Sequence, residues 1–259
     1  SGLVGVEVDG ATAGMNIRYN RIGTDAAGTA NWGMQQNGIL IENAAGGAGP
    51  TNIHISSNTV AFSGQGNVYT AGIAILGTAG ANINISANSI YSNVGLGIDL
   101  GAVGVTANDT GDADTGPNQL QNFPVLTSAT FGDDRLLIVG TLNSNPSTTY
   151  RIEFFSSVSG DASAHGEGQV FLGATSVITD SNGNASFSAQ LTGTGMTSSR
   201  VVSATATEDL GGGTYGSTSE FGANINSVAA GPTVSVPPTQ TIAEDGSLVF
   251  SRSEEHTSE

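Results

Sequence analysis

Two short patterns of apolar and polar residues alternate along the N-terminal part of the chain. In the first, apolar and polar positions alternate up to an asparagine, and a further apolar residue follows two positions later. It occurs in GMNIRYNRI (14–22), NIHISSNTV (52–60) and NINISANSI (82–90). In the second, a glycine is followed by an apolar residue, then by any residue, and then by a second apolar residue. It occurs in GVEV (5–8), GILI (38–41), GIAI (72–75) and GIDL (97–100).

When the stretches of the first pattern are aligned, matching residues fall into columns. The apolar column holds Ile17, Ile55 and Ile85, and the polar column holds Asn20, Asn58 and Asn88. An apolar spacing of two predicts strands rather than helices. A series of β-hairpins would show two-residue Asn-Gly turns at fixed positions, and the pattern lacks them. Regular strands joined by loops of unequal length therefore predict a solenoid, in which each repeat is one coil and like strands stack in register.

We expect residues 1–106 to form about three such coils. The isoleucine column should point into the coil, and the asparagine column should form a ladder of side-chain amides along the axis. The first residues, SGLVGVEVDG (1–10), already have the form of a strand within a repeat, so we expect the solenoid to begin upstream of Ser1.

From residue 123 the pattern changes to a succession of short alternating runs. They are FPVLTSATF (123–131), RLLIVGTLN (135–143), TYRIEFFSS (149–157), QVFLGATSVIT (169–179), NASFSAQL (184–191), RVVSATAT (200–207) and TSEFGANI (218–225). DSNG (180–183) and the glycines at 211–213 predict turns between them. Strands at this spacing predict an immunoglobulin-like β-sandwich over residues 123–226.

Three further segments complete the predicted organisation. Residues 107–122 form an Asp-rich connector, and 227–251 form a linker and the first strands of a further, truncated β-domain. The last residues, RSEEHTSE (252–259), match the translation of AGATCGGAAGAGCACACGTCTGAA, which resembles common sequencing-adapter DNA. We interpret them as an artefact tail and leave them out of the fold prediction. The alternative is a genuine acidic tail.

Charge and composition narrow the choice of partners. The formal net charge is −16, every basic residue is an arginine, and cysteine is absent. Such a chain is a poor partner for nucleic acid and for anionic membrane surfaces, whereas cations and neutral glycans remain possible. The absence of cysteine excludes disulfides and thiol chemistry. No stretch has the length of a transmembrane helix. An acidic, cysteine-free chain rich in small polar residues is typical of exported bacterial proteins, so we expect an extracellular or cell-surface location.

Several of these motifs together resemble a known family. The NxI and GIDLG repeats, followed by GVTANDTGDADTGPNQLQNFPVL (104–126), resemble bacterial right-handed parallel β-helix repeat proteins of the pectin-lyase-like superfamily. The stretches YRIEFFSS, GEGQVFLG and TDSNGNASF resemble the immunoglobulin-like domain that follows the helix in large bacterial surface proteins. PTVSVPPTQTIAEDGSLVFS (232–251) resembles the start of a cadherin-like repeat. The resemblance implies this architecture, but the superfamily contains lyases, hydrolases, adhesins and structural proteins alike.

The connector holds the densest group of oxygen ligands in the chain. NDTGDADTGPN (108–118) offers Asn108, Asp109, Asp112, Asp114 and Asn118 between glycines that permit tight bends. Several carboxylates within a few residues suit calcium, although the spacing is not that of an EF-hand. The sequence therefore predicts a calcium site at Asp109, Asp112, Asp114 and Asn118. The alternative is a solvated turn in which each aspartate caps its own backbone.

Candidates for catalysis lie where the stacked strands face outward. One outward column holds Glu7, Leu40, Ala74 and Asp99. Asp9 and Glu42 follow the ends of strands on adjacent coils, and carboxylates at about 5 Å could serve a retaining glycosidase. The known β-helix hydrolase and lyase patterns are absent, so a polar, solvated face is the favoured alternative and no catalytic set is assigned.

Trp32 lies in the long loop GTDAAGTANWGMQQN (23–37), where an exposed indole could stack on a sugar and a folded-back one would cover an apolar edge. Three functions therefore remain open. The favoured one is a non-catalytic segment of a large exported surface protein, an adhesin or structural stalk, that contacts glycans or surface molecules of a host or neighbouring cell. The alternatives are a carbohydrate-active β-helix enzyme and a carbohydrate-binding module.

Overall fold

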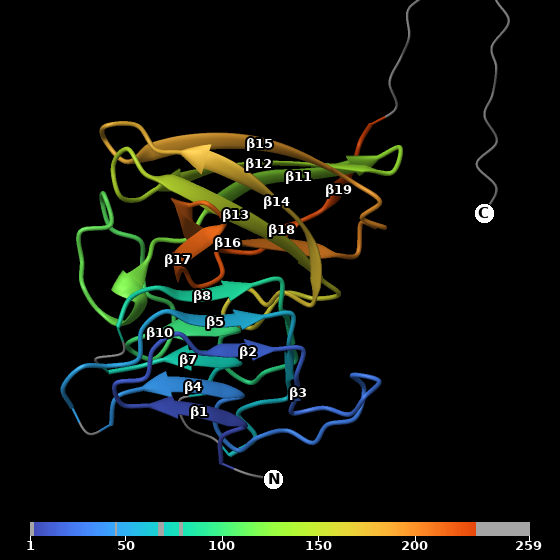
Figure 1. The fold of residues 1–259 in the computed structure, drawn as a ribbon. Coiled ribbons are helices and arrows are strands. Elements are labelled where there is room, and N and C mark those ends of the chain that lie inside the picture. The colour runs from blue at the N-terminus through green and yellow to red at the C-terminus, as the bar shows by residue number, and fades with distance from the viewer. Residues whose placement is uncertain (1–2, 45, 67–69, 78–79, 232–259) are drawn as a thin grey trace, which may run out of the picture.

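The protein is all-β, with both parallel and antiparallel sheets, in a computed structural model that describes residues 3–44, 46–66, 70–77 and 80–231. Strands β1 to β10 build the parallel part, and strands β11 to β19 build the antiparallel part. The two parts lie one above the other, with the N-terminal strands at the far end of the parallel part (Figure 1). The predicted further β-domain (233–251) and the tail (252–259) lie outside the described residues.

In the parallel part, the chain contributes a strand to each of three sheets in turn, and then repeats the circuit. The first sheet contains β1 (Val6–Asp9), β4 (Ile39–Glu42), β7 (Ile73–Ile75) and β10 (Ile98–Leu100). The second contains β2 (Asn16–Arg18), β5 (Ile53–Ser56) and β8 (Ile83–Ser86). The third contains β3 (Arg21–Ile22), β6 (Thr59–Ala61) and β9 (Ser89–Tyr91). All these pairings are parallel, so like strands of successive circuits stack as predicted.

The predicted columns are confirmed by both register and burial. Ile17 pairs with Ile55, and Ile55 pairs with Ile85. Each is buried in one apolar core that runs through the parallel part. This core arises because alternate side chains of a strand point to the same face, so each isoleucine lands on the isoleucine of the next circuit.

The asparagine ladder is also confirmed. The side-chain amide Nδ2 of Asn20 donates to Asn58 Oδ1 at 3.0 Å, and Asn58 Nδ2 donates to Asn88 Oδ1 at 3.0 Å. The backbone N–H groups of Asn20 and Asn58 donate to the same two oxygens at 2.9 Å. The ladder therefore satisfies backbone and side-chain groups together at the turn between the second and third sheets.

The outward column is not the solvated face that the sequence suggested. Only Glu7 in this column is exposed, whereas Leu40, Ala74 and Asp99 are buried. Leu40 and Ala74 form a small apolar cluster of their own with neighbours from the segments that flank the strands. The prediction was wrong because alternation along a strand defines its two faces but does not reveal whether other segments cover the outer one.

A short 3-10 helix, η1 (Pro117–Leu120), lies between the two parts of the chain. The antiparallel part then contains two sheets. One sheet contains β15 (Asn184–Thr192), β12 (Arg135–Asn143), β11 (Val125–Gly132) and β19 (Val228–Ala229). The other contains β14 (Val170–Ile178), β13 (Thr149–Ser157), β16 (Val201–Gly211), β17 (Thr214–Thr218) and β18 (Ile225–Asn226). A second apolar core, which includes Tyr150 and Phe154, draws residues from both sheets.

Six of the seven predicted runs form strands close to their expected positions, and the turns at 180–183 and 211–213 are present. The seventh run, 218–225, is the exception. Strand β17 ends at Thr218, and most of the run is irregular before the two-residue strand β18. Its backbone and side chains contact the parallel part instead, as described below. The predicted linker also contributes a short strand, because Val228 and Ala229 pair in parallel with Thr130 and Phe131 of β11.

Candidate metal centre at the junction

The last strands of the parallel part carry backbone N–H groups that a further circuit would otherwise bind. Residues of the antiparallel part and of the connector accept hydrogen bonds from these groups. At β8, Ile83 N–H donates to Asn118 Oδ1 at 2.8 Å, and Ile85 N–H donates to Thr218 Oγ1 at 2.9 Å. At β9, Ile90 N–H donates to the carbonyl of Gly168 at 2.9 Å. Because buried backbone donors need partners, these contacts close the end of the parallel part.

Three buried glutamates from the antiparallel part perform the same task at the turns. Ala87 N–H donates to Glu153 Oε2 at 2.8 Å, and Asn93 Nδ2 donates to Glu167 Oε1 at 2.6 Å. Leu100 N–H donates to Glu220 Oε1 at 2.9 Å, and Thr106 N–H donates to Glu220 Oε2 at 3.0 Å. Each carboxylate thus replaces the oxygen acceptors that a stacked strand would supply.

Burial dominates the electrostatics of these glutamates. It raises the pKa of Glu167 and of Glu220 to about 7, although their hydrogen bonds to backbone N–H groups act in the opposite direction. Burial also raises the pKa of Glu153, which forms an ion pair with Arg151 at 2.9 Å. The junction therefore contains carboxyl groups that take up protons near neutral pH.

Apolar contacts accompany the polar ones. Phe155 of β13 and Phe221 belong to the core of the parallel part, and their rings meet edge to face at 5.3 Å between centroids. Gly97 permits this packing, because a Cβ there would lie 2.9 Å from the Phe221 ring. The five-stranded sheet faces the parallel part, and β17 lies beside β8 (Figure 1). The core of the parallel part thus extends into the antiparallel part through these two rings.

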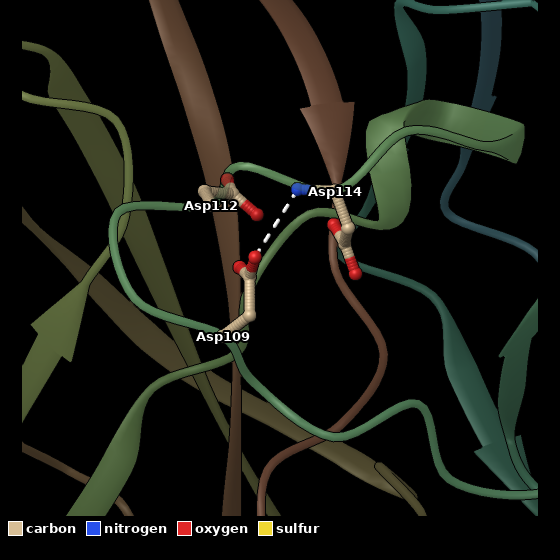
Figure 2. Close-up of side chains that lie close together, drawn as sticks. All are labelled: Asp109, Asp112 and Asp114. Atoms are coloured by element: carbon tan, nitrogen blue, oxygen red, sulfur yellow. Dashed lines mark hydrogen bonds between the residues drawn. The ribbon is translucent and has the colours of Figure 1, made fainter.

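The candidate metal ligands lie in the connector at the edge of this junction. One carboxylate oxygen from each of Asp109, Asp112 and Asp114 lies within 4.8 Å of the others. Figure 2 shows that the Asp109 carboxylate accepts a hydrogen bond from the backbone N–H of Asp114, at 3.1 Å. The connector therefore curls around Asp109, which draws together carboxylates that are close in sequence.

The three aspartates differ in their surroundings. Asp112 is buried and accepts hydrogen bonds from Asn122 N–H at 3.0 Å and from the Ser144 hydroxyl at 2.6 Å. Burial raises its pKa to about 6. Asp114 is half-buried, and its Oδ1 is buried without a hydrogen-bond partner among the described residues. Burial and the nearby Asp109 raise the pKa of Asp114.

This group has the chemistry of a metal site, since three carboxylates of like charge converge and at least one of their oxygens lacks a donor. Hard cations bind carboxylate oxygens, and calcium takes them at about 2.3–2.6 Å in a flexible shell. Two oxygens on opposite sides of such an ion would lie about 5 Å apart, which the spacing of the three aspartates can meet. The three aspartates could therefore hold a metal ion.

The asparagines of the predicted site have other partners. The Asn118 side chain is fully buried, accepts from Ile83 N–H, and donates to the carbonyls of Ile83 and Thr218 at 2.9 and 2.7 Å. Asn108 exchanges two hydrogen bonds with the backbone of Phe123. Both residues tie the connector to the parallel and antiparallel parts.

The catalytic candidates occupy neighbouring strands. Asp9 and Glu42 are partners in the register of β1 and β4. Asp9 Oδ1, however, accepts hydrogen bonds from Gly10 N–H at 2.7 Å and from Ala44 N–H at 3.0 Å, so it caps the loops that follow both strands. Burial and the charges of Glu7 and Asp9 raise the pKa of Glu42.

Trp32 is exposed, with 64% of its surface accessible. Its backbone N–H donates to the carbonyl of Gly23 at 3.0 Å, which closes the part of the loop between these two residues. The residue lines an open hollow of about 370 Å³ that also contacts Asn20, Arg21 and Met34. The indole is therefore available to a ligand.

The glutamates of the junction are the functional residues that the sequence did not reveal. A weak signal exists in TYRIEFFSS, where Phe155 shares a face with Glu153 and Arg151. A large apolar residue on an otherwise charged face indicates that something covers this face. The covering residues come from strands far away in the sequence, so no local pattern could identify them.

Comparison with known proteins adds no assignment. No protein-family profile matches the sequence, and no curated protein matches it. Among the described residues, no helix has the length and apolar character needed to cross a membrane.

Proposed function

We propose that this chain is a non-catalytic segment of a large exported bacterial surface protein, an adhesin or a structural stalk. In this proposal, the parallel part is a right-handed β-helix of the pectin-lyase-like type, and the antiparallel part is an immunoglobulin-like sandwich that follows it. The closed junction carries the proposal. Buried carboxylates, amides and aromatic rings join the two parts. A protein that transmits force, or that holds a binding surface away from the cell, requires such a firm connection between its parts.

Calcium at Asp109, Asp112 and Asp114 belongs to the same proposal. A divalent cation would neutralise the converging carboxylates and hold the connector in one geometry. The connector lies beside both parts, because Asn118 bonds to β8 and the Ser144 hydroxyl bonds to Asp112. Binding there would stiffen the junction.

A carbohydrate-binding role is a second candidate, and the exposed Trp32 favours it. An aromatic face beside a hollow with polar side chains is a common platform for a sugar ring. Trp32 is well suited to report such binding, since it is the chain's single tryptophan and its fluorescence would change when a sugar covers the indole.

A screen of the full chain against a panel of polysaccharides distinguishes the three functions. We expect no new reducing ends or unsaturated products under a surface-segment or binding role. Product formation that Glu42→Gln abolishes would instead establish the enzyme and overturn the proposal. Saturable quenching of Trp32 fluorescence without product formation would support the binding module. A Trp32→Ala variant that no longer binds the polysaccharide in a direct binding assay would then establish it.

A further inference from the structure

A second cavity, away from the three aspartates, lies between the parallel part and the loop that follows β13. Its volume is about 340 Å³, within the range of pockets that hold small ligands. One wall comes from residues 94–96 and 103–105 around β10, and the other from residues 161–163. The site therefore exists only where the two parts meet.

Asp99 of β10 lines this cavity. It is 4% exposed, and its Oδ1 is buried with no hydrogen-bond partner among the described residues. Burial raises its pKa to about 6, against the lowering effect of a hydrogen bond from the Gly104 backbone, so the carboxylate is still mostly ionised at neutral pH. A buried charge without a counter-ion is costly and marks a place where a ligand can contribute one.

The rest of the lining defines the chemistry of such a ligand. Asp161, whose Oδ1 accepts a hydrogen bond from Ser163 N–H at 2.7 Å, adds a second carboxylate. None of the lining residues within the described part of the chain is basic, so an anion would be repelled. Val94, Val103 and Val105 line the cavity although they are exposed, and they offer an aliphatic surface. Among the lining residues that the structure describes, none is aromatic, so this part of the chain offers no flat face on which a sugar ring could stack.

We propose that this cavity binds a small aliphatic ammonium ion. Asp99 and Asp161 receive the charged nitrogen through charge-assisted hydrogen bonds, and the three valines cover the hydrocarbon chain. The same chemistry is present in a free alkylamine and in the side chain of a lysine on a partner protein.

Titration of the ¹⁵N-labelled full chain with n-butylammonium chloride, followed by NMR, tests the proposal. We expect saturable shifts of the backbone amides in 94–96, 103–105 and 161–163. n-Butanol has a similar hydrocarbon chain without the charge, and it should bind at least tenfold more weakly. Nα-acetyl-lysine amide distinguishes the two sources, because a cavity that accepts a partner's lysine should give the same shifts with it.

Two variants and a matched control complete the design. Asp99→Asn and Asp161→Asn should each weaken butylammonium binding at least tenfold. Asp99 is buried, so Asp99→Asn could fail to fold. Asp161→Asn keeps the test valid in that case, since Asp161 lies in a partly exposed loop. Asp133→Asn makes the same charge change at an exposed turn and should leave binding unaltered. Equal binding of butanol, equal weakening by Asp133→Asn, or shifts that sodium chloride alone reproduces would overturn the proposal.

Discussion

At the scale of single residues, Asn58 shows how one side chain can serve several backbone groups. Its Oδ1 accepts from the backbone and side-chain N–H groups of Asn20, and its Nδ2 donates to the carbonyl of Ile17 and to Asn88 Oδ1. Asn58 is also almost fully buried, whereas Asn20 at the end of the ladder is exposed. Removal of Asn58 would therefore leave buried donors and acceptors without partners and without water.

We expect Asn58→Ala to lower the free energy of unfolding by about 1–3 kcal/mol, because an unpaired buried polar group costs that much. Asn20→Ala is the matched control and should cost less, since water can replace the lost hydrogen bonds. Chemical denaturation of both variants gives the two values. Equal losses would show that the ladder does not stabilise the fold through burial.

Asp112, Asp114 and Asp109 permit a direct test of the metal site. If calcium binds only the folded protein, a hundredfold excess over its dissociation constant should stabilise the fold by about 2.7 kcal/mol. The melting temperature should therefore rise with millimolar calcium, and less with magnesium, which requires a tighter octahedral shell. Asp114→Asn should remove most of this rise, and Asp133→Asn should not.

The same site should respond to pH in a defined direction. Burial raises the pKa of Asp112 to about 6, so below this pH the group takes up a proton that competes with the cation. Calcium affinity measured by calorimetry should accordingly fall between pH 7 and pH 5. If calcium gives no heat and no change in melting temperature, the three aspartates are only turn caps.

At the scale of elements, the edge strands β8 and β10 are closed by side chains, and β9 is closed by the backbone carbonyl of Gly168. An uncovered edge of a sheet invites pairing with other chains, and the buried glutamates prevent this at the junction. They do so at a cost, because each carboxyl group is withdrawn from water. This cost makes the stability of the protein depend on pH.

The folded state should be more stable at pH 5 than at pH 8. Burial raises the pKa of Glu167 and of Glu220 from 4.5 to about 7, so between these values the folded protein binds more protons than the unfolded chain. The resulting stability is present below pH 4.5 and is lost as the pH rises through 7. Melting temperatures measured in a calcium chelator should fall by several degrees between pH 5 and pH 8.

Glu167→Gln should flatten this dependence, because the amide oxygen can still accept from Asn93 but does not titrate. Asp133→Asn is the matched control on an exposed side chain and should retain the full dependence. A melting temperature that rises from pH 5 to pH 8 in the unmodified protein would contradict the assignment of Glu167 and Glu220 as buried, titrating groups.

At the scale of the whole molecule, the junction makes the two parts interdependent. Phe155 and Phe221 come from the antiparallel part but belong to the core of the parallel part. Separation of the parts would expose these rings together with the three glutamates and the backbone donors that they satisfy. The parts should therefore support each other's folding.

Calorimetry should show one unfolding transition for both parts. Ile138→Ala removes a fully buried side chain in the core of the antiparallel part and should shift the whole transition to lower temperature. Two separate transitions, of which Ile138→Ala moves only one, would show that the junction is too weak to couple the parts.

The sequence alone determined the periodic elements. A spacing of two along each strand places Ile17, Ile55 and Ile85 on one face, and the repeated asparagine supplies its own partner in the next circuit. Burial and hydrogen bonding in such columns depend on residues that occupy equivalent places in each repeat. Alignment of the repeats was therefore enough to predict the buried isoleucines and the asparagine ladder. The runs that became β11 to β16 were recognisable from the alternation of apolar and polar residues within each run.

Only the tertiary structure decided what covers the faces and edges of these elements. Glu153, Glu167 and Glu220 bond to groups that lie 66, 74 and 120 residues away. Asp99 was expected in solvent but is buried. Most of run 218–225 is not a strand, and its residue Glu220 accepts a hydrogen bond from the end of the parallel part. No local pattern encodes these contacts, because they depend on which surfaces meet after each part has folded. The same distance in sequence hid the cavity at Asp99, whose walls come from two parts of the chain.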